Sequence, residues 1–198
     1  DGIGTDELLR RAVVAAAPAL PVVVMQRVEE AAWEHGIASF DGVCQEQLTT
    51  FARARWSGTV HEPMLFTADG KVVGGCLVMI QKLPLGLGGI AVAKWGPMLA
   101  EALRPDRMAI YAAMIEAMVQ HYARERRLML SVMPHAALED GNPEFEHLLG
   151  RGFRPGAAFG FPNRYVVNLR VSEEAQRKSL EQKWRYHLNK SEKAGLIF

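Results

Sequence analysis

The chain has 198 residues, of which 49% are hydrophobic and 23% charged, and its formal net charge is +1. This composition predicts a folded globular chain with ample material for a core, and it excludes a largely disordered one. No apolar run approaches the ~18 residues of a membrane-spanning helix, and Cys44 and Cys76 form no C-x-x-C pair, which argues against a disulfide framework or a zinc site and fits a reducing compartment.

Patterns typical of helices and of one short edge strand occupy the first third of the chain. Helices are expected over residues 5–17, 29–35 and 43–56, and the edge strand over residues 22–25. Gly36 is expected to close the second of these helices.

A β-hairpin is the clearest local prediction. Two apolar segments, residues 63–68 and 72–82, are separated by an Asp-Gly pair, the strongest short-range hairpin signal. Gly74 and Gly75 lie inside the second strand and indicate a bulge or a close approach of another part of the chain.

Strands are next expected over residues 90–95 and 128–133, on either side of a long helix over residues 107–126. This order predicts a βαβ crossover and therefore parallel pairing within the sheet. A short helix over residues 143–149 and a last strand over residues 165–170 complete an α+β chain with a mixed sheet.

The last part of the chain is basic and helical. Ser172 is expected to cap one long helix that ends at Gly195 and carries an apolar stripe at Leu180, Trp184 and Leu188. From Arg164 onward there are eight Lys or Arg residues against four Asp or Glu. This balance suggests that the segment meets an anionic partner, and a solvated helix face is the alternative.

A family resemblance rests on this same segment. A strand containing VVNL is followed by Ser-Glu-Glu and then by a basic run that ends in Lys-Ala-Gly. The segment resembles the junction in FemAB/FemX-type enzymes, aminoacyltransferases that build the interpeptide bridges of peptidoglycan, and a weaker resemblance extends back to about Trp33. The fold of that family is two GNAT-like (acetyltransferase-like) lobes in tandem.

The resemblance implies a division of the chain into three parts. Residues 1–36 would be a lead-in, residues 37–171 a GNAT-like lobe, and residues 172–198 a linking helix with the start of a second lobe. The Leu-Leu-Gly-Arg-Gly-Phe run at 148–153 is similar to the loop that closes the GNAT core. The sequence leaves open whether the chain is a fragment or a short protein.

Cofactor and metal chemistry are not expected. In GNAT acetyltransferases, a [QR]-x-x-G-x-[GA] loop holds the pyrophosphate of acetyl-CoA at the start of the long helix, but residues 96–106 contain no such glycines. Acyl-CoA is therefore expected only under an alternative function. The six histidines form no H-x-x-x-H or H-E-x-x-H motif, so metal catalysis is not expected either.

The resemblance also points to candidate site residues. FemX-like proteins often show a Gln and, eight residues later, a Lys that reaches the nucleotide-linked precursor, and Gln45 and Arg53 hold this spacing. Arginine can bind phosphate in a fork, and a solvent-facing arginine is the alternative. The family places an acid after the Gly-Pro pair. Glu101, one position late, is a candidate general base or an ordinary first-turn acid.

Within the basic helix, Lys178, Gln182, Arg185 and Asn189 are expected to share one face. That face could contact the phosphates of a nucleotide- or lipid-linked precursor, or the acceptor end of an aminoacyl-tRNA. The residues expected to bind such anions are Arg53, Lys178, Lys183, Arg185 and Lys190.

The function implied by the resemblance is transfer of an amino acid or other acyl group from aminoacyl-tRNA to an amine on a peptidoglycan precursor. The reaction would take place in the cytoplasm, at the inner face of the membrane where the precursor is lipid-linked. It needs no covalent enzyme intermediate, which fits a sequence without an evident nucleophile. Two alternatives stay open: a GNAT-fold N-acyltransferase that uses acyl-CoA, and a non-catalytic GNAT-like binding module of envelope assembly.

Overall fold

A computed structural model describes residues 20–40, 42–84, 87–135, 141–156 and 171–194. The chain divides into two compact units, residues 1–158 and 159–198. The helix predicted over residues 5–17 and the strand predicted over residues 165–170 lie outside the described residues. The predicted boundaries after residues 36 and 171 stay predictions.

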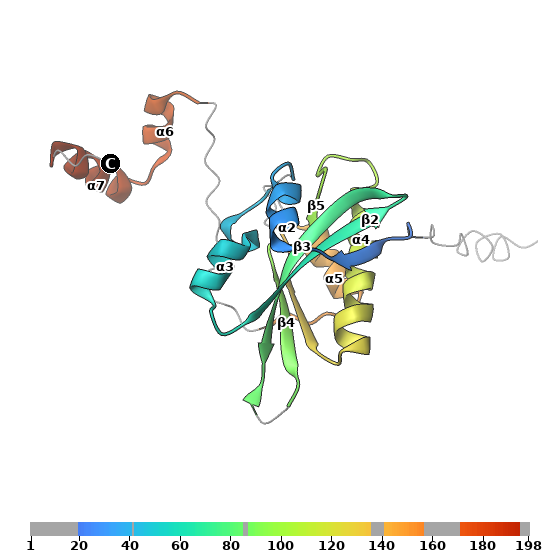
Figure 1. Ribbon diagram of the computed structural model, residues 1–198. Coiled ribbons are helices and arrows are strands. Elements are labelled where there is room, and N and C mark those ends of the chain that lie inside the picture. Colours follow the sequence, from blue (N-terminus) through green and yellow to red (C-terminus); the bar gives the residue numbers. More distant parts are fainter. Residues whose placement is uncertain (1–19, 41, 85–86, 136–140, 157–170, 195–198) are drawn as a thin grey trace, which may run out of the picture. The chain divides into compact units, whose positions relative to one another are not determined.

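The first unit is built on a mixed sheet in the order β1-β2-β3-β4-β6, with β5 paired to β3 beside that path (Figure 1). The strands are β1 (Val24–Arg27), β2 (Val60–Ala68), β3 (Lys71–Lys82), β4 (Gly89–Lys94), β5 (Met98–Leu99) and β6 (Met129–Met133). Strands β4 and β6 pair in parallel and the other pairs are antiparallel. The predicted α+β class and the predicted βαβ crossover are confirmed.

Helical elements pack on both faces of this sheet. Those described in the first unit are α2 (Glu30–Ile37), the 3-10 turn η1 (Gln45–Gln47), α3 (Thr49–Arg55), α4 (Arg107–Met118), the π-helix η3 (Val119–Glu125) and α5 (Pro143–Gly150). No helix in the described part of the chain is both long and apolar enough to span a bilayer.

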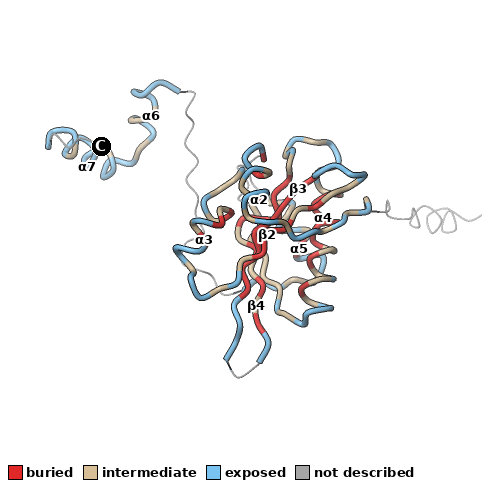
Figure 2. Tube along the Cα trace, in the orientation of Figure 1, coloured by how far each residue is buried: buried red, intermediate tan, exposed pale blue. Residues whose placement is uncertain are grey.

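Strand β3 explains why the sheet has two cores. Val78 and Ile80 point into the core on the α4 side, whereas Leu77 and Met79 point into the core on the α2 and α3 side. Because both faces of β3 are covered, its sequence is a continuous apolar run rather than an alternating one. Figure 2 shows the central strands buried between these helices.

The predicted hairpin is confirmed. Strands β2 and β3 are joined at Asp69 and Gly70, whose φ angles of 48° and 72° are both positive. A two-residue turn with two positive φ angles matches the twist of the flanking strands, and an Asp-Gly pair suits it because glycine has no Cβ to clash.

The close approach predicted at the two glycines of β3 is also confirmed. A Cβ on Gly75 would lie 2.7 Å from the ring of Trp33, and one on Gly74 would lie 2.5 Å from Sδ of Met114. The pairing of β2 with β3 shifts register beside Phe66, opposite Gly74. The glycines therefore let one helix approach each face of the sheet.

Three of the predicted helices differ in detail. The helix expected over residues 43–56 is interrupted at Leu48, whose φ of −88° and ψ of 126° are extended. The helix expected over residues 107–126 becomes a π-helix after Met118. Gly36 lies inside α2 instead of closing it, because the helix continues to Ile37, whose side chain is buried.

The second unit contains α6 (Glu173–Ser179) and α7 (Gln182–Lys193). Ser172 caps α6 as predicted, since its hydroxyl accepts a hydrogen bond from the N–H of Ala175 at 3.3 Å. The single long helix is wrong, because the chain becomes extended at Leu180 with a ψ of 144°. Arg185 closes the end of α6 by donating to the carbonyl oxygens of Lys178, at 2.9 Å, and of Leu180.

Candidate functional site

The two parallel strands β4 and β6 part where both end. Their last pair is Lys94 with Met133, and the N–H of Gly96 still donates to the carbonyl of Met133 at 3.1 Å. After Lys94, the chain leaves β6 through Trp95 and the cis Gly96–Pro97 peptide and pairs with β3 again at Met98. In open sheets with parallel strands, ligands bind at the carboxyl ends of the strands, which makes this opening a candidate site.

A bulge separates β4 from β5. Ala93 pairs with Val78 and Met98 pairs with Gly75, so the chain makes five steps opposite three steps of β3. The two additional residues leave backbone groups without partners in the ladder.

Gln47 fills that gap. Its side chain is fully buried, its Oε1 accepts from the N–H of Leu77 at 2.7 Å, and its Nε2 donates to the carbonyl of Lys94. Its own carbonyl accepts from Nε1 of Trp33 at 2.8 Å. A Cβ at Gly96 would lie 3.2 Å from Nε2 of Gln47, so glycine lets the amide approach the bulge. Gln47 thus fixes the opening from the α2 side.

The surroundings of the bulge shift the pKa values of two side chains, the thiol of Cys76 and the ammonium of Lys94. Cys76 is completely buried, and this burial raises the pKa of its thiol, so the thiol stays protonated and is not a nucleophile. The ammonium of Lys94 lies 4.0 Å from the ring centre of Trp56, a cation–π contact. Burial lowers the pKa of Lys94, while Glu46 opposes the shift.

A polar cluster follows directly on β6. The backbone N–H of His135 donates to Oε2 of Glu144 at 3.0 Å, and Asn142 donates from Nδ2 to the carbonyl of His135 at 2.7 Å. Asn142 also caps α5, accepting from the N–H groups of Glu144 and Phe145 at 3.1 Å. The first turn of α5 therefore fixes the backbone of His135 at the end of the strand.

The imidazole of His135 stands beside a carboxylate. Its Nδ1 lies 3.8 Å from Oε2 of Glu144, and its side chain is 22% exposed. A protonated ring would form an ion pair with the carboxylate of Glu144. Nε2 of the ring is buried and has no hydrogen-bond partner among the described residues, so Nδ1 is the nitrogen that can exchange a proton at the carboxyl end of β6.

Tyr111 and His147 extend the cluster on the α4 side. Their rings meet edge to face with centres 6.0 Å apart, and neither the hydroxyl of Tyr111 nor Nε2 of His147 has a hydrogen-bond partner among the described residues. Burial raises the pKa of Tyr111, with Glu144 adding to the effect. The phenol therefore stays neutral inside the protein.

The start of α4 does not resemble a pyrophosphate site. Arg104 donates to both carboxylate oxygens of Asp106, at 2.5 and 3.0 Å, directly before the helix begins at Arg107. An ion pair of two side chains thus stands at the helix N-terminus, where a pyrophosphate would need bare amides. Glu101, the predicted general base, is exposed in the same loop after β5.

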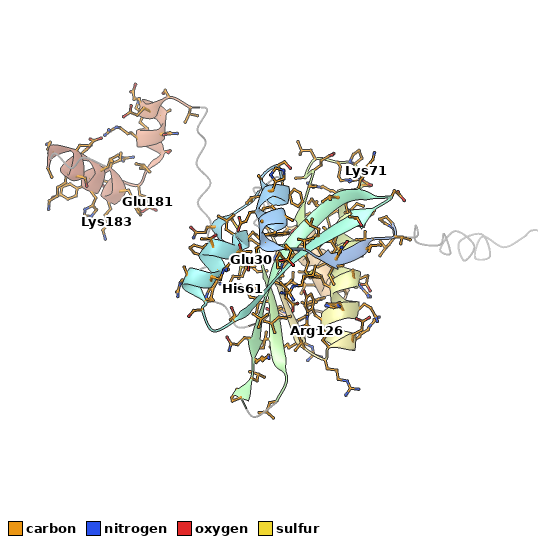
Figure 3. All side chains as sticks on the ribbon, viewed as in Figure 1. Glu30, His61, Lys71, Arg126, Glu181 and Lys183 are labelled. Carbon is orange, nitrogen blue, oxygen red and sulfur yellow. The ribbon has the colours of Figure 1, made fainter. Side chains whose placement is uncertain are left out.

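Arg53 is on α3, where its guanidinium forms an ion pair with Glu30 of α2. Its side chain is 59% exposed, so it remains accessible. Figure 3 labels Glu30 and His61 in this part of the first unit. Burial, together with the charge of Arg53, lowers the pKa of His61. Gln45, its predicted companion, is exposed in η1, whereas Gln47 is the buried amide.

The other predicted anion-binding residues lie in the second unit. Lys178 pairs with Glu174 at 2.8 Å, and the guanidinium of Arg185 is taken up by the carbonyl groups at the end of α6. Lys183 and Lys190 are exposed on α7 (Lys183 is labelled in Figure 3) and form no ion pair with any described residue. Because the helix breaks at Leu180, Lys178 does not share a helical face with the residues of α7, contrary to the prediction.

Sequence reasoning missed both Gln47 and His135. Gln47 gave no signal, because a glutamine within a helical pattern looks like a surface residue. His135 had one: it follows the strand that ends the βαβ unit, where polar residues often form sites. Among the described residues, no group of three or more His, Cys, Asp or Glu side chains could hold a metal ion.

No protein-family model and no curated protein match the chain. Among solved structures, it is similar to the crystal structure of FemX, with a TM-score of 0.53 and 15% identity over 66% of this chain and 32% of that chain. The fold is GNAT-like. The chain spans about a third of that FemX chain.

Two acetyltransferases are also similar in structure. One is a predicted acetyltransferase from Clostridium acetobutylicum with acetyl-CoA, with a TM-score of 0.44 and 12% identity over 75% of this chain and 97% of that chain. The other is an acetyltransferase from Trypanosoma brucei, with a TM-score of 0.43 and 13% identity over 74% of this chain and 99% of that chain.

Proposed function

We propose that the protein is an acyltransferase of the FemX kind. It transfers an amino acid or other acyl group from an activated ester, such as aminoacyl-tRNA, to an amine on a nucleotide- or lipid-linked peptidoglycan precursor. The observation that carries the proposal is the similarity in fold to FemX over 66% of the chain. The cytoplasmic side of the membrane is where both substrates would meet.

The start of α4 supports a donor other than acyl-CoA. A GNAT cofactor places its pyrophosphate against bare amides at this helix N-terminus. Here the loop has no glycine between Gly96 and Arg107, so side chains stand where bare amides would be needed, and the guanidinium of Arg104 is already paired with Asp106.

His135 supplies the proton acceptor. The free amine of the acceptor attacks the ester carbonyl, a C–N bond forms, the C–O bond to the donor breaks, and the departing oxygen takes up a proton. The attacking nitrogen must lose a proton, which Nδ1 of His135 accepts, since Nε2 is buried. Glu144, 3.8 Å from Nδ1, then stabilises the imidazolium.

Anion binding falls to the exposed cations. Arg53 can hold a phosphate in a bidentate fork while Glu30 orients it. On α7, Lys183 and Lys190 can attract the phosphates of the donor or the acceptor. Such attraction through exposed side chains weakens as salt is added.

The proposal is tested by measuring transfer from aminoacyl-tRNA to the nucleotide-linked muramoyl pentapeptide. Exchanging His135 for Gln should lower kcat about 100-fold, the usual contribution of a general base. His35→Gln is the matched control, since His35 is exposed on α2. Equal activities of the two variants would remove His135 from the reaction.

The other two functions give different results in the same assay. Transfer from acetyl-CoA in place of aminoacyl-tRNA would identify an N-acyltransferase. Saturable binding of the precursor without turnover from either donor would identify a binding module.

A further inference from the structure

A second pocket lies at the other end of α4, where the helix passes into η3. Its volume is about 330 Å³, and it is lined by Met25, Arg27, Glu62, Met64, His121 and Arg126. The first four belong to β1 and β2, and Arg27 stands beside Met64 in the strand register. Figure 3 labels Arg126 at this end of the helix. None of these residues belongs to the opening between β4 and β6.

The π-helix shapes one wall of this pocket. In an α-helix, two residues five positions apart point about 140° away from each other. In η3, the N–H of Arg126 donates to the carbonyl of His121 at 3.2 Å, the five-residue bond of a π-helix. His121 and Arg126 therefore face the same pocket. π-Helical segments are rare and are frequent at functional sites.

The floor of the pocket holds a buried carboxylate in a fixed position. Arg126 donates to Oε2 of Glu62 at 2.6 Å and to Oε1 at 3.2 Å, and the hydroxyl of Tyr122 donates to Oε2 at 3.1 Å. The side chain of Glu62 is only 9% exposed. Nη1 of Arg126 also lies 3.4 Å from Nε2 of His121, whose Nδ1 lies 3.4 Å from Oε2 of Glu125.

One positive charge of the pocket is left without a partner. Glu62 compensates Arg126, and Glu125 lies beside His121, but the exposed side chain of Arg27 forms no hydrogen bond or ion pair with any described residue. Met25 and Met64 contribute flexible apolar surface, which suits an alkyl group. The pocket therefore combines one free guanidinium with an apolar wall.

We propose that this pocket is a second ligand site, which binds a small organic anion: its anionic group lies on Arg27 and its alkyl part on Met25 and Met64. The volume lies at the lower end of the range of small-molecule sites, so the ligand is small. A carboxylate and a phosphate monoester share this chemistry. The site is independent of the proposed transferase reaction.

The probes are hexanoate, hexyl phosphate and neutral hexanol, titrated into the protein with ¹³C-labelled methionine methyl groups. We expect saturable shifts of the Met25 and Met64 methyl signals with one or both anions and not with hexanol. Which anion binds more tightly distinguishes a carboxylate ligand from a phosphate ligand. Arg27→Gln should weaken binding about tenfold, the effect of one charged hydrogen bond.

Arg124→Gln is the matched control. It removes the same charge from an exposed residue of η3 that does not line the pocket. Binding of hexanol as tight as that of the anions, equal affinities of the two variants, or no shift of either methyl signal would each overturn the proposal. Both substitutions lie on exposed side chains, so each variant should fold, and circular dichroism checks that it does.

Discussion

The side-chain oxygen of Gln47 accepts a hydrogen bond from the backbone N–H of Leu77 at 2.7 Å, across a separation of 30 residues. With its amide nitrogen on the carbonyl of Lys94, Gln47 replaces the ladder bonds that the bulge between β4 and β5 removes. One buried side chain thus stabilises the place where the parallel strands part.

Replacing Gln47 by Ala should lower the free energy of unfolding by about 2–6 kcal/mol, because two buried backbone groups lose their partners at roughly 1–3 kcal/mol each. Urea denaturation measures the change. Gln45→Ala, an exposed position of the same turn, should change stability by less than about 0.5 kcal/mol. Similar losses in both variants would show that Gln47 does not stabilise the bulge.

The hairpin of β2 and β3 and the βαβ crossover of β4, α4 and β6 could be predicted, because an Asp-Gly turn joins the first two strands and a long helix lies between the other two. The π-helix after Met118 could not, since its residues have an ordinary helical pattern. The break at Leu180 depends on Arg185 reaching the carbonyl groups of α6, a contact that residue spacing does not reveal. The role of Gln47 depends on a bulge formed by residues 93–98, which lie far along the chain from it.

Gly74→Ala should be strongly destabilising. The added methyl group would lie on the backbone carbonyl of Met98 and 2.5 Å from Sδ of Met114, and the backbone of β5 cannot move without breaking its pairing with β3. The expected loss is about 3 kcal/mol, the upper end for overpacking. Thermal unfolding compares this variant with Gly58→Ala, where a Cβ meets nothing within 4 Å. A melting temperature equal to that of the control would contradict the close approach.

Arg126→Leu should cost about 2–3 kcal/mol, because it leaves the buried Glu62 carboxylate without its charged partner. The value is below that of a fully buried pair, since the Arg126 side chain is 34% exposed. Adding Glu62→Leu should recover part of the loss by removing the unpaired charge. A double-mutant cycle by urea denaturation measures the coupling, and strictly additive losses would show that the pair contributes nothing.

The stability should decrease on acidification through the titration of His147. Burial, helped by Arg151 and opposed by Glu116, lowers its pKa below the ordinary 6.5. The unfolded chain therefore binds the proton more strongly than the folded one, so the contribution is complete above pH 6.5 and is lost as the pH falls toward the lowered pKa.

His147→Phe, which keeps an aromatic ring against Tyr111, should reduce the fall in unfolding free energy between pH 7 and pH 5. Urea denaturation at several pH values measures this slope, and His35→Phe, at an exposed position, is the control. If His147→Phe leaves the pH profile unchanged, the ring is as easily protonated in the folded protein as in the unfolded chain.

The most direct test of the proposed function is a binding titration of the protein with UDP-linked muramoyl pentapeptide and, separately, with acetyl-CoA, each at low and at moderate salt. We predict saturable binding of the precursor that weakens with salt and is reduced by Arg53→Ala. We predict no binding of acetyl-CoA, because the loop before α4 has no glycine to expose amides to its pyrophosphate and Arg104 is already paired with Asp106. Saturable binding of acetyl-CoA without binding of the precursor would contradict the FemX-type function and would identify an acyl-CoA-dependent N-acyltransferase.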